Sequence, residues 1–334
     1  MNHNPKLTSS ELASLWSSYI SDSMNICIMK HFLANVDDEQ IKEIVHHSKE
    51  LSTGHIESLI SIFNKENLPL PIGYTDADVN EQAPRLFSDI FYLRFLQFMG
   101  RTGTNINGMA LGITYREDVR AFYKSTVNES AELYDNIIRL MTKKGILVRS
   151  PYIPYYQQVE FIQDDHFLEG YLTLHKRPLL AIEIAHLSNI IEANVIGRTL
   201  VDGLTQVAEA KEVKKHLQEG FELGSQIIKA IEQILEENHT NTPFSSDSTI
   251  TNSTITTFSD KLIMGILSAL TTVSIGSIGQ GIGASMRSDI IGEYTKLLAK
   301  IGKFAMKSGK ISIKNGWIEK PPQTIDREKL QKGN

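Results

Sequence analysis

The sequence has little of what usually points to a specific chemistry: cysteine, clustered basic residues and a secretion signal. Cys27 is the single cysteine among 334 residues, which excludes an internal disulfide, a zinc knuckle and a thiolate cluster. No run of lysine or arginine stands out and the net charge is −5, so we expect no nucleic-acid partner. The first residues lack a basic stretch followed by an apolar run, so no signal peptide is predicted and a cytoplasmic protein is expected.

What the sequence does contain is a long internal duplication. A shift of 171 positions places Phe87-Ser88-Asp89 on Phe258-Ser259-Asp260, and a shift of 172 places Glu11 on Glu183. Such a register, kept over most of the chain, indicates two diverged copies of one unit. The predicted organisation is a first unit over 1–155, a linker over 156–178, a second unit over 179–322 and a C-terminal tail over 323–334.

Each copy shows the hydrophobic period of four helices. In the first copy the apolar residues predict helices over about 8–36, 38–66, 87–113 and 116–144. Ser88 and Asp89 suit the start of the third helix, and Gly145 suits the end of the fourth. No segment alternates convincingly between apolar and polar residues, so strands are not expected.

The lengths of the connections decide the predicted topology. Short links join the first helix to the second and the third to the fourth, whereas roughly twenty residues separate the second from the third. A link that long can cross the whole bundle, which is the ferritin-like connection. We therefore predict an all-α protein of two tandem ferritin-like four-helix bundles. The second crossover, over 239–257, is rich in serine and threonine and is interpreted as a solvated connection.

Several short segments carry a resemblance to a known family: 68–74, 83–89, Gln206-Val207-Ala208, 258–262, and 315–319 followed by Pro321-Pro322. Through them the sequence resembles an uncharacterised family of two-repeat, ferritin-like proteins from spore-forming bacteria, which is distantly similar to spore coat protein F. The resemblance implies the fold and a link to sporulation, with a location in the forespore or spore coat as an alternative to the cytoplasm. It brings no established activity.

A ferritin-like bundle suggests a di-iron or di-manganese carboxylate site. That chemistry needs a glutamate from each of two helices and Glu-x-x-His from each of the other two. The sequence has three Glu-x-x-His matches, of which the first is expected to face solvent and the last lies at a helix end. They are Glu43/His46, Glu183/His186 and Glu236/His239.

The third helices argue against a complete site of this kind. Neither 90–115 nor 262–286 contains an acidic residue, so the full ligand set is not expected in either bundle. Three residues are kept as candidate metal ligands: His55, which falls on the apolar face of the second helix, and the pair Glu183 and His186. For His55 we favour a buried histidine hydrogen-bonded to a hydroxyl of Tyr19 or Ser23.

These features favour a non-enzymatic structural or protein-interaction role, with no cofactor and with protein partners or self-association. The alternative is a ferritin-like protein that binds a metal or a small ligand. In this alternative the metal is iron or manganese, and the protein is either redox-active or a simple binding protein. The uncharged stretch 262–286 is long enough for a membrane span. Its repeat partner carries Arg94 and Arg101, so we predict a packed bundle helix and no transmembrane segment. Peripheral membrane association is a further alternative.

Overall fold

A computed structural model describes residues 5–171, 176–241 and 249–331. The first four-helix unit, called bundle one, contains α1 (Ser9–Asn35), α2 (Glu39–Lys65), α3 (Asp89–Gly112) and α4 (Glu117–Lys143). The second unit, bundle two, contains α5 (Ala181–Val207), α6 (Lys211–Glu237), α7 (Asp260–Ala284) and α8 (Ser288–Lys314). Short helices η1 (Asp76–Asp78), η2 (Asp165–Leu168) and α9 (Arg327–Gln331) lie in the connections and the tail.

The helix bounds confirm the duplication. α1 and α2 match α5 and α6 at a shift of 172, and both ends of α4 match those of α8 at a shift of 171. The predicted caps are also present, since the hydroxyls of Ser88 and Ser259 accept hydrogen bonds from backbone amides in the first turns of α3 and α7. Gly145 follows α4 with φ of 69°, a backbone conformation that glycine adopts without strain.

The contacts at the two ends of bundle one establish the crossover. At one end Lys65, the last residue of α2, pairs with Asp118 at the start of α4. At the other end Asp89, the first residue of α3, accepts a hydrogen bond of 2.8 Å from the backbone amide of Asp38. The connection over 66–88 therefore runs the length of the bundle, and α2 and α3 point the same way. This is the predicted ferritin-like connection.

The two crossover segments pair with each other, which the sequence did not predict. Two isolated β-bridges, Val79 with Phe258 and Phe87 with Ile250, join them. A shift of 171 positions carries Val79 onto Ile250 and Phe87 onto Phe258, so each bridge is the repeat counterpart of the other. The two halves are therefore related by a pseudo-two-fold axis, as in an isologous dimer. Four backbone hydrogen bonds obey the same relation: Asn80 N–H to Thr257 O with Thr251 N–H to Leu86 O, and Ser88 N–H to Thr249 O with Ser259 N–H to Asp78 O.

The interpretation of the second crossover as solvated is only partly right for its described C-terminal part, where Thr249, Asn252, Thr254 and Ile255 are exposed. Thr257 and the adjoining Phe258 are buried, and 249–251 is hydrogen-bonded to the first crossover. Backbone groups buried away from water need such partners, and the other crossover supplies them. The remainder of the predicted loop includes 242–248, which lies outside the described residues.

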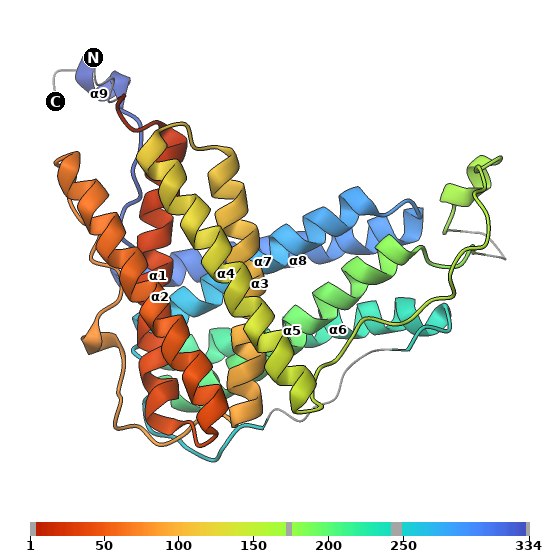
Figure 1. The fold of residues 1–334 in the computed structure, drawn as a ribbon, viewed down its shortest axis with the longest axis horizontal. Helices are drawn as coiled ribbons and strands as arrows, with labels where there is room; N and C mark the ends of the chain where they lie inside the picture. The colour runs from red at the N-terminus through yellow and green to blue at the C-terminus, as the bar shows by residue number, and fades with distance from the viewer. Residues whose placement is uncertain (1–4, 172–175, 242–248, 332–334) are drawn as a thin grey trace.

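The bundles cross steeply and share one core (Figure 1). Buried side chains from α1, α3, α5 and α7 meet there, among them Phe32, Phe91, Leu204 and Leu262. By length and mean hydropathy α7 could span a membrane, and 39% of its most apolar window is buried within the molecule. Its first turns lie in the shared core, which explains much of their apolar character.

Candidate functional site

His55 joins three helices of bundle one through two carboxylates. Its Nδ1 lies 3.2 Å from Oδ1 of Asp22 on α1, and its Nε2 lies 2.6 Å from Oε2 of Glu129 on α4. The hydroxyl of Ser125, one turn earlier on α4, donates to the other carboxylate oxygen of Glu129 at 2.7 Å. Figure 1 shows the places of α1, α2 and α4 in bundle one. We call Asp22, His55 and Glu129 the bundle-one trio.

The trio corrects the expected environment of His55. The side chain is largely buried, as predicted, but its partners are acids and not the hydroxyls of Tyr19 or Ser23. The Ser23 hydroxyl donates to the carbonyl of Ile20 instead. The apolar period of α2 placed His55 inward, but it carried no information on how α1 and α4 are rotated toward it.

The two acids determine the charge of His55. Burial disfavours the imidazolium, but hydrogen bonds and charge attraction from Asp22 and Glu129 outweigh it and raise the pKa of His55 to about 9. Burial also acts on Glu129, where the hydrogen bonds from Ser125 and His55 prevail and lower its pKa. His55 is therefore a cation at neutral pH, and both of its ring nitrogens are donors.

This arrangement suits an ion-pair cluster better than a metal site. Metal binding needs neutral imidazole with a free lone pair, whereas each ring nitrogen of His55 faces a carboxylate. The acids lie on opposite sides of the ring. Among the described residues the bundle-one trio does not bring one donor atom from each member within 4.8 Å of the others. His55 and Glu129 border an open groove of about 710 Å³ between α2 and α4, which is also lined by Glu50, Glu57 and Asp118.

Glu183 is fully buried at the start of α5 and belongs to a different kind of network. Its carboxylate accepts two hydrogen bonds of 2.8 Å from the guanidinium of Arg177 and others from the backbone amides of Leu180, Met286 and Arg287. Against the cost of burial, these donors lower its pKa. The carboxylate therefore ties α5 to the corner between α7 and α8.

Bundle one has the same backbone network at its own end, although the position that corresponds to Arg177 is Pro5. Glu11 accepts hydrogen bonds from the backbone amides of Thr8, Tyr115 and Arg116. Although burial opposes it, these donors lower the pKa of Glu11 to about 2. The shift of 171 or 172 carries each of these groups onto its counterpart around Glu183. A network present in both copies and directed at backbone amides has a structural role.

The predicted candidates do not form one site. His55 lies in bundle one, whereas Glu183 and His186 lie on α5 of bundle two. His186 is half-buried one turn after Glu183, outside the network that holds the carboxylate. The other two Glu-x-x-His matches lie as expected: His46 is exposed and pairs with Glu50, and His239 follows the end of α6.

The comparisons with known proteins agree with the duplicated fold. A family profile described as a protein of unknown function, DUF3231, matches residues 1–159 and again 170–330. The chain belongs to the DUF3231 family. No curated protein matches the sequence.

One solved structure similar to this DUF3231 protein comes from Bacillus halodurans C-125 and is provisionally described as a spore coat protein. It is 19% identical, covers 45% of this chain and 98% of its own, and superposes with a TM-score of 0.43. It therefore matches about one repeat in length.

Cys27 of this DUF3231 protein is a buried thiol that no described residue around it activates. Burial and the nearby acids raise its pKa to about 12, and the thiol donates to the carbonyl of Thr75. A thiol with such a pKa is protonated at neutral pH and is a poor nucleophile. His31, one turn later, is buried against the ring of Phe258, and its burial lowers its pKa to about 4.

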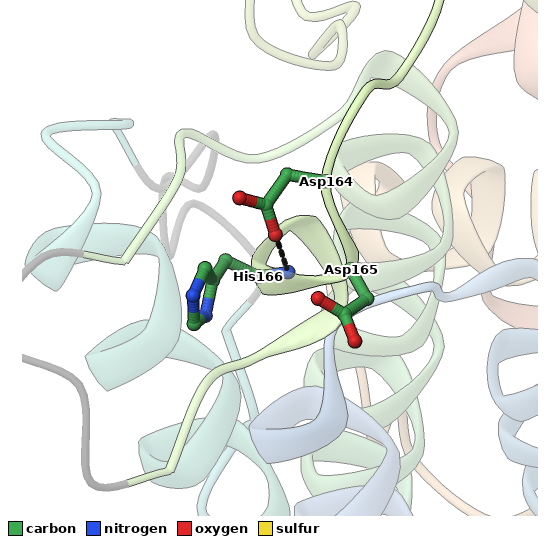
Figure 2. Close-up of side chains that lie close together, drawn as sticks. All are labelled: Asp164, Asp165 and His166. Carbon is green, nitrogen blue, oxygen red and sulfur yellow. Dashed lines mark hydrogen bonds between the residues drawn. The ribbon is translucent and has the colours of Figure 1, made fainter.

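Among the described residues, one group brings three potential metal ligands within 4.8 Å of one another, and the sequence reasoning missed it. Asp164, Asp165 and His166 lie at the exposed start of η2 (Figure 2). Asp164 accepts a hydrogen bond from the backbone amide of His166, and the His166 ring pairs with Glu169 at 3.1 Å. These contacts are those of a capped turn, and we assign the group no binding role.

Proposed function

We propose that this DUF3231 protein acts without catalysis, by binding proteins through the linker between its bundles. The observation that supports this is an exposed aromatic segment over 152–162. Monomeric surfaces rarely leave so many large apolar side chains open to water, and tyrosine and phenylalanine are enriched at interfaces. The exposed side chains are Tyr152 (77%), Tyr155 (78%), Tyr156 (86%), Val159 (81%), Phe161 (82%) and Ile162 (55%).

The aromatic segment is held at both of its ends. On the α4 side Ile146 and Leu147 pack against the shared core. On the α5 side Phe167 lies under the guanidinium of Arg177, and Tyr171 donates to the backbone of Asp289 at 3.5 Å. Holding a binding segment at both ends reduces the conformational entropy that a partner must overcome.

The polar groups inside the bundles support a role without catalysis. The bundle-one trio satisfies its own charges, Glu183 is occupied by its network, and Cys27 is not activated. A general base or nucleophile needs a pKa suited to its task and a free path to substrate. None of these three groups meets both conditions.

Site-specific photo-crosslinking tests the proposal. The full chain would carry benzoylphenylalanine in place of Tyr156, with a matched variant at the exposed Glu132 on α4. We expect a discrete crosslinked product from position 156 and none from position 132. Sedimentation velocity then separates self-association from binding of another protein.

A second variant tests whether the apolar side chains of the aromatic segment are needed for the crosslinked product. Tyr152→Ser/Phe161→Ser removes apolar surface from the linker without touching either core, so the fold should persist by circular dichroism. We expect it to abolish the product at position 156. Identical products from both positions, or none, would refute the proposal. The link to sporulation rests on the sequence resemblance alone, and a fluorescent fusion followed through spore formation tests that part.

A further inference from the structure

The centres of the two bundles have diverged at three neighbouring positions. In bundle one these positions hold Asn25 on α1 and Ser48 and Ser52 on α2, all of them buried. The side-chain amide of Asn25 donates to the hydroxyls of Ser52 at 2.9 Å and of Ser48 at 3.3 Å. Side chains that bond to one another therefore fill this part of bundle one.

In bundle two the same three positions, found by adding 172, are Gly197, Gly220 and Gly224. All three lie inside helices, where glycine is less stable than alanine. A Cβ at Gly197 would meet nothing closer than Leu270 at 3.8 Å, and one at Gly224 would meet Arg198 at 3.6 Å, both ordinary contacts. Neither of these two positions needs glycine to avoid a clash, whereas a Cβ at Gly220 would lie 2.9 Å from the ring of Phe304.

The three glycines line a cavity of about 70 Å³ among the four helices of bundle two, and Phe98 of α3 also borders it. Ile227, which occupies the position of His55, lines it together with Leu267, Leu270 and Phe304. A cavity of this size exceeds what one water molecule needs, but water requires several polar partners and these walls are mostly hydrocarbon. The site therefore favours an apolar occupant.

Two polar groups on the wall of the cavity favour a ligand with one kind of polar end group. The hydroxyl of Ser274 is buried without a hydrogen-bond partner among the described residues. The guanidinium of Arg198 lies 5.7 Å from the ring centroid of Phe221, and among the described residues it forms no ion pair with a carboxylate. An arginine free of acids beside an apolar cavity suits a carboxylate.

We propose that the centre of bundle two binds a short aliphatic carboxylate. The hydrocarbon chain occupies the glycine-lined cavity, and the carboxylate pairs with Arg198. This site is distinct from the bundle-one trio and from the linker, and it does not depend on the protein-binding role.

A chain-length series of simple carboxylates tests the cavity in the full-length protein. Propionate, butyrate, pentanoate and hexanoate would be titrated while methyl NMR signals of Ile227 and Leu270 are followed. We expect saturable shifts at these methyls and none at Ile137 in bundle one. Each added methylene should raise affinity by about fourfold until the cavity is full. Absence of saturable shifts at Ile227 and Leu270 would overturn the proposal.

Two double alanine variants test whether pentanoate binds in the glycine-lined cavity. Gly197→Ala/Gly224→Ala adds two methyl groups beside the cavity and should weaken pentanoate binding by about tenfold. The matched control, Gly276→Ala/Gly279→Ala, makes the same change on α7 where a Cβ meets nothing within 4 Å. We expect the control to bind as the wild type does. Both variants should fold, because alanine favours the helix. Equal affinity in the two variants would overturn the proposal.

The charge of Arg198 is tested separately. Arg198→Gln should weaken pentanoate binding by about tenfold and leave binding of pentanol unchanged. An equal loss for both probes, or no loss for either, would overturn the assignment of Arg198 to the carboxylate.

Discussion

Replacing His55 by glutamine should destabilise bundle one in a manner that depends on pH. In the wild type a cation lies between Asp22 and Glu129, and glutamine would leave those two acids without a positive charge. A rise in the pKa of His55 from 6.5 to about 9 corresponds to about 3–4 kcal/mol, at about 1.4 kcal/mol per pKa unit. Because the Glu129 side chain is 33% exposed, screening by solvent should reduce this to about 2 kcal/mol.

The sign follows from the direction of the change. The pKa of His55 is higher in the folded protein than in the unfolded chain, so its contribution is fully present below about pH 6.5. The contribution falls as the pH rises through 9, where the folded protein loses the proton. The stability difference between wild type and His55→Gln should therefore be largest at acidic to neutral pH and vanish near pH 10.

Urea unfolding between pH 6 and pH 10 measures this difference, with the fluorescence of Trp16 on α1 as the probe for bundle one. His46→Gln is the matched control, because His46 is exposed on the same helix. NMR titration of the histidine rings gives the pKa of His55 directly. A stability difference that does not change with pH, or a midpoint near 6.5, would refute the ion-pair description of the trio.

Three further predictions concern the networks around Glu11 and Glu183, the contact between Gly203 and Phe87 in the shared core, and metal binding. Glu11→Gln and Glu183→Gln should each lower the free energy of unfolding by about 2–3 kcal/mol near pH 7, as measured by urea unfolding. Because the pKa of Glu11 is lower in the folded protein, its contribution to stability should be lost as the pH falls from about 4.5 toward 2. Equal stability of variant and wild type would contradict this. Gly203→Ala should destabilise the protein by about 1–3 kcal/mol, because its Cβ would clash with the Phe87 ring. Gly276→Ala, where a Cβ meets nothing within 4 Å, should stabilise it by up to about 1 kcal/mol in the same assay. Elemental analysis after anaerobic loading with iron(II) or manganese(II) should find less than one metal ion per chain, and stoichiometric metal that His55→Ala removes would show that the trio rearranges into a ligand set.

The helices and their topology could be predicted because they depend on short-range patterns. The apolar period marks each helix to within a few residues, and the long link between the second and third helices requires a crossover. The pairing of the two crossovers could not be predicted in this way. Its hydrogen bonds join residues such as Asn80 and Thr257, which are 177 positions apart and show no alternating pattern.

The site was predicted only in part, for a related reason. Periodicity placed His55 toward the interior, but its partners come from two other helices whose rotation the sequence does not fix. Asp22 and Glu129 lie at the edges of their helices' apolar faces, where an acid is usually solvated. The Glu11 and Glu183 pairing was visible as an alignment of repeats, yet its role depends on backbone amides more than 100 residues away.

The pattern of divergence between the copies bears on function. The parts that hold each bundle together have been kept in both, as the networks around Glu11 and Glu183 demonstrate. The centres have not: His55 corresponds to Ile227, and the polar cluster around Asn25 corresponds to glycines around Gly197. The two interiors therefore differ in chemistry. In bundle one the interior is polar and charged, and in bundle two the walls are mostly apolar around the cavity where we propose that a carboxylate binds.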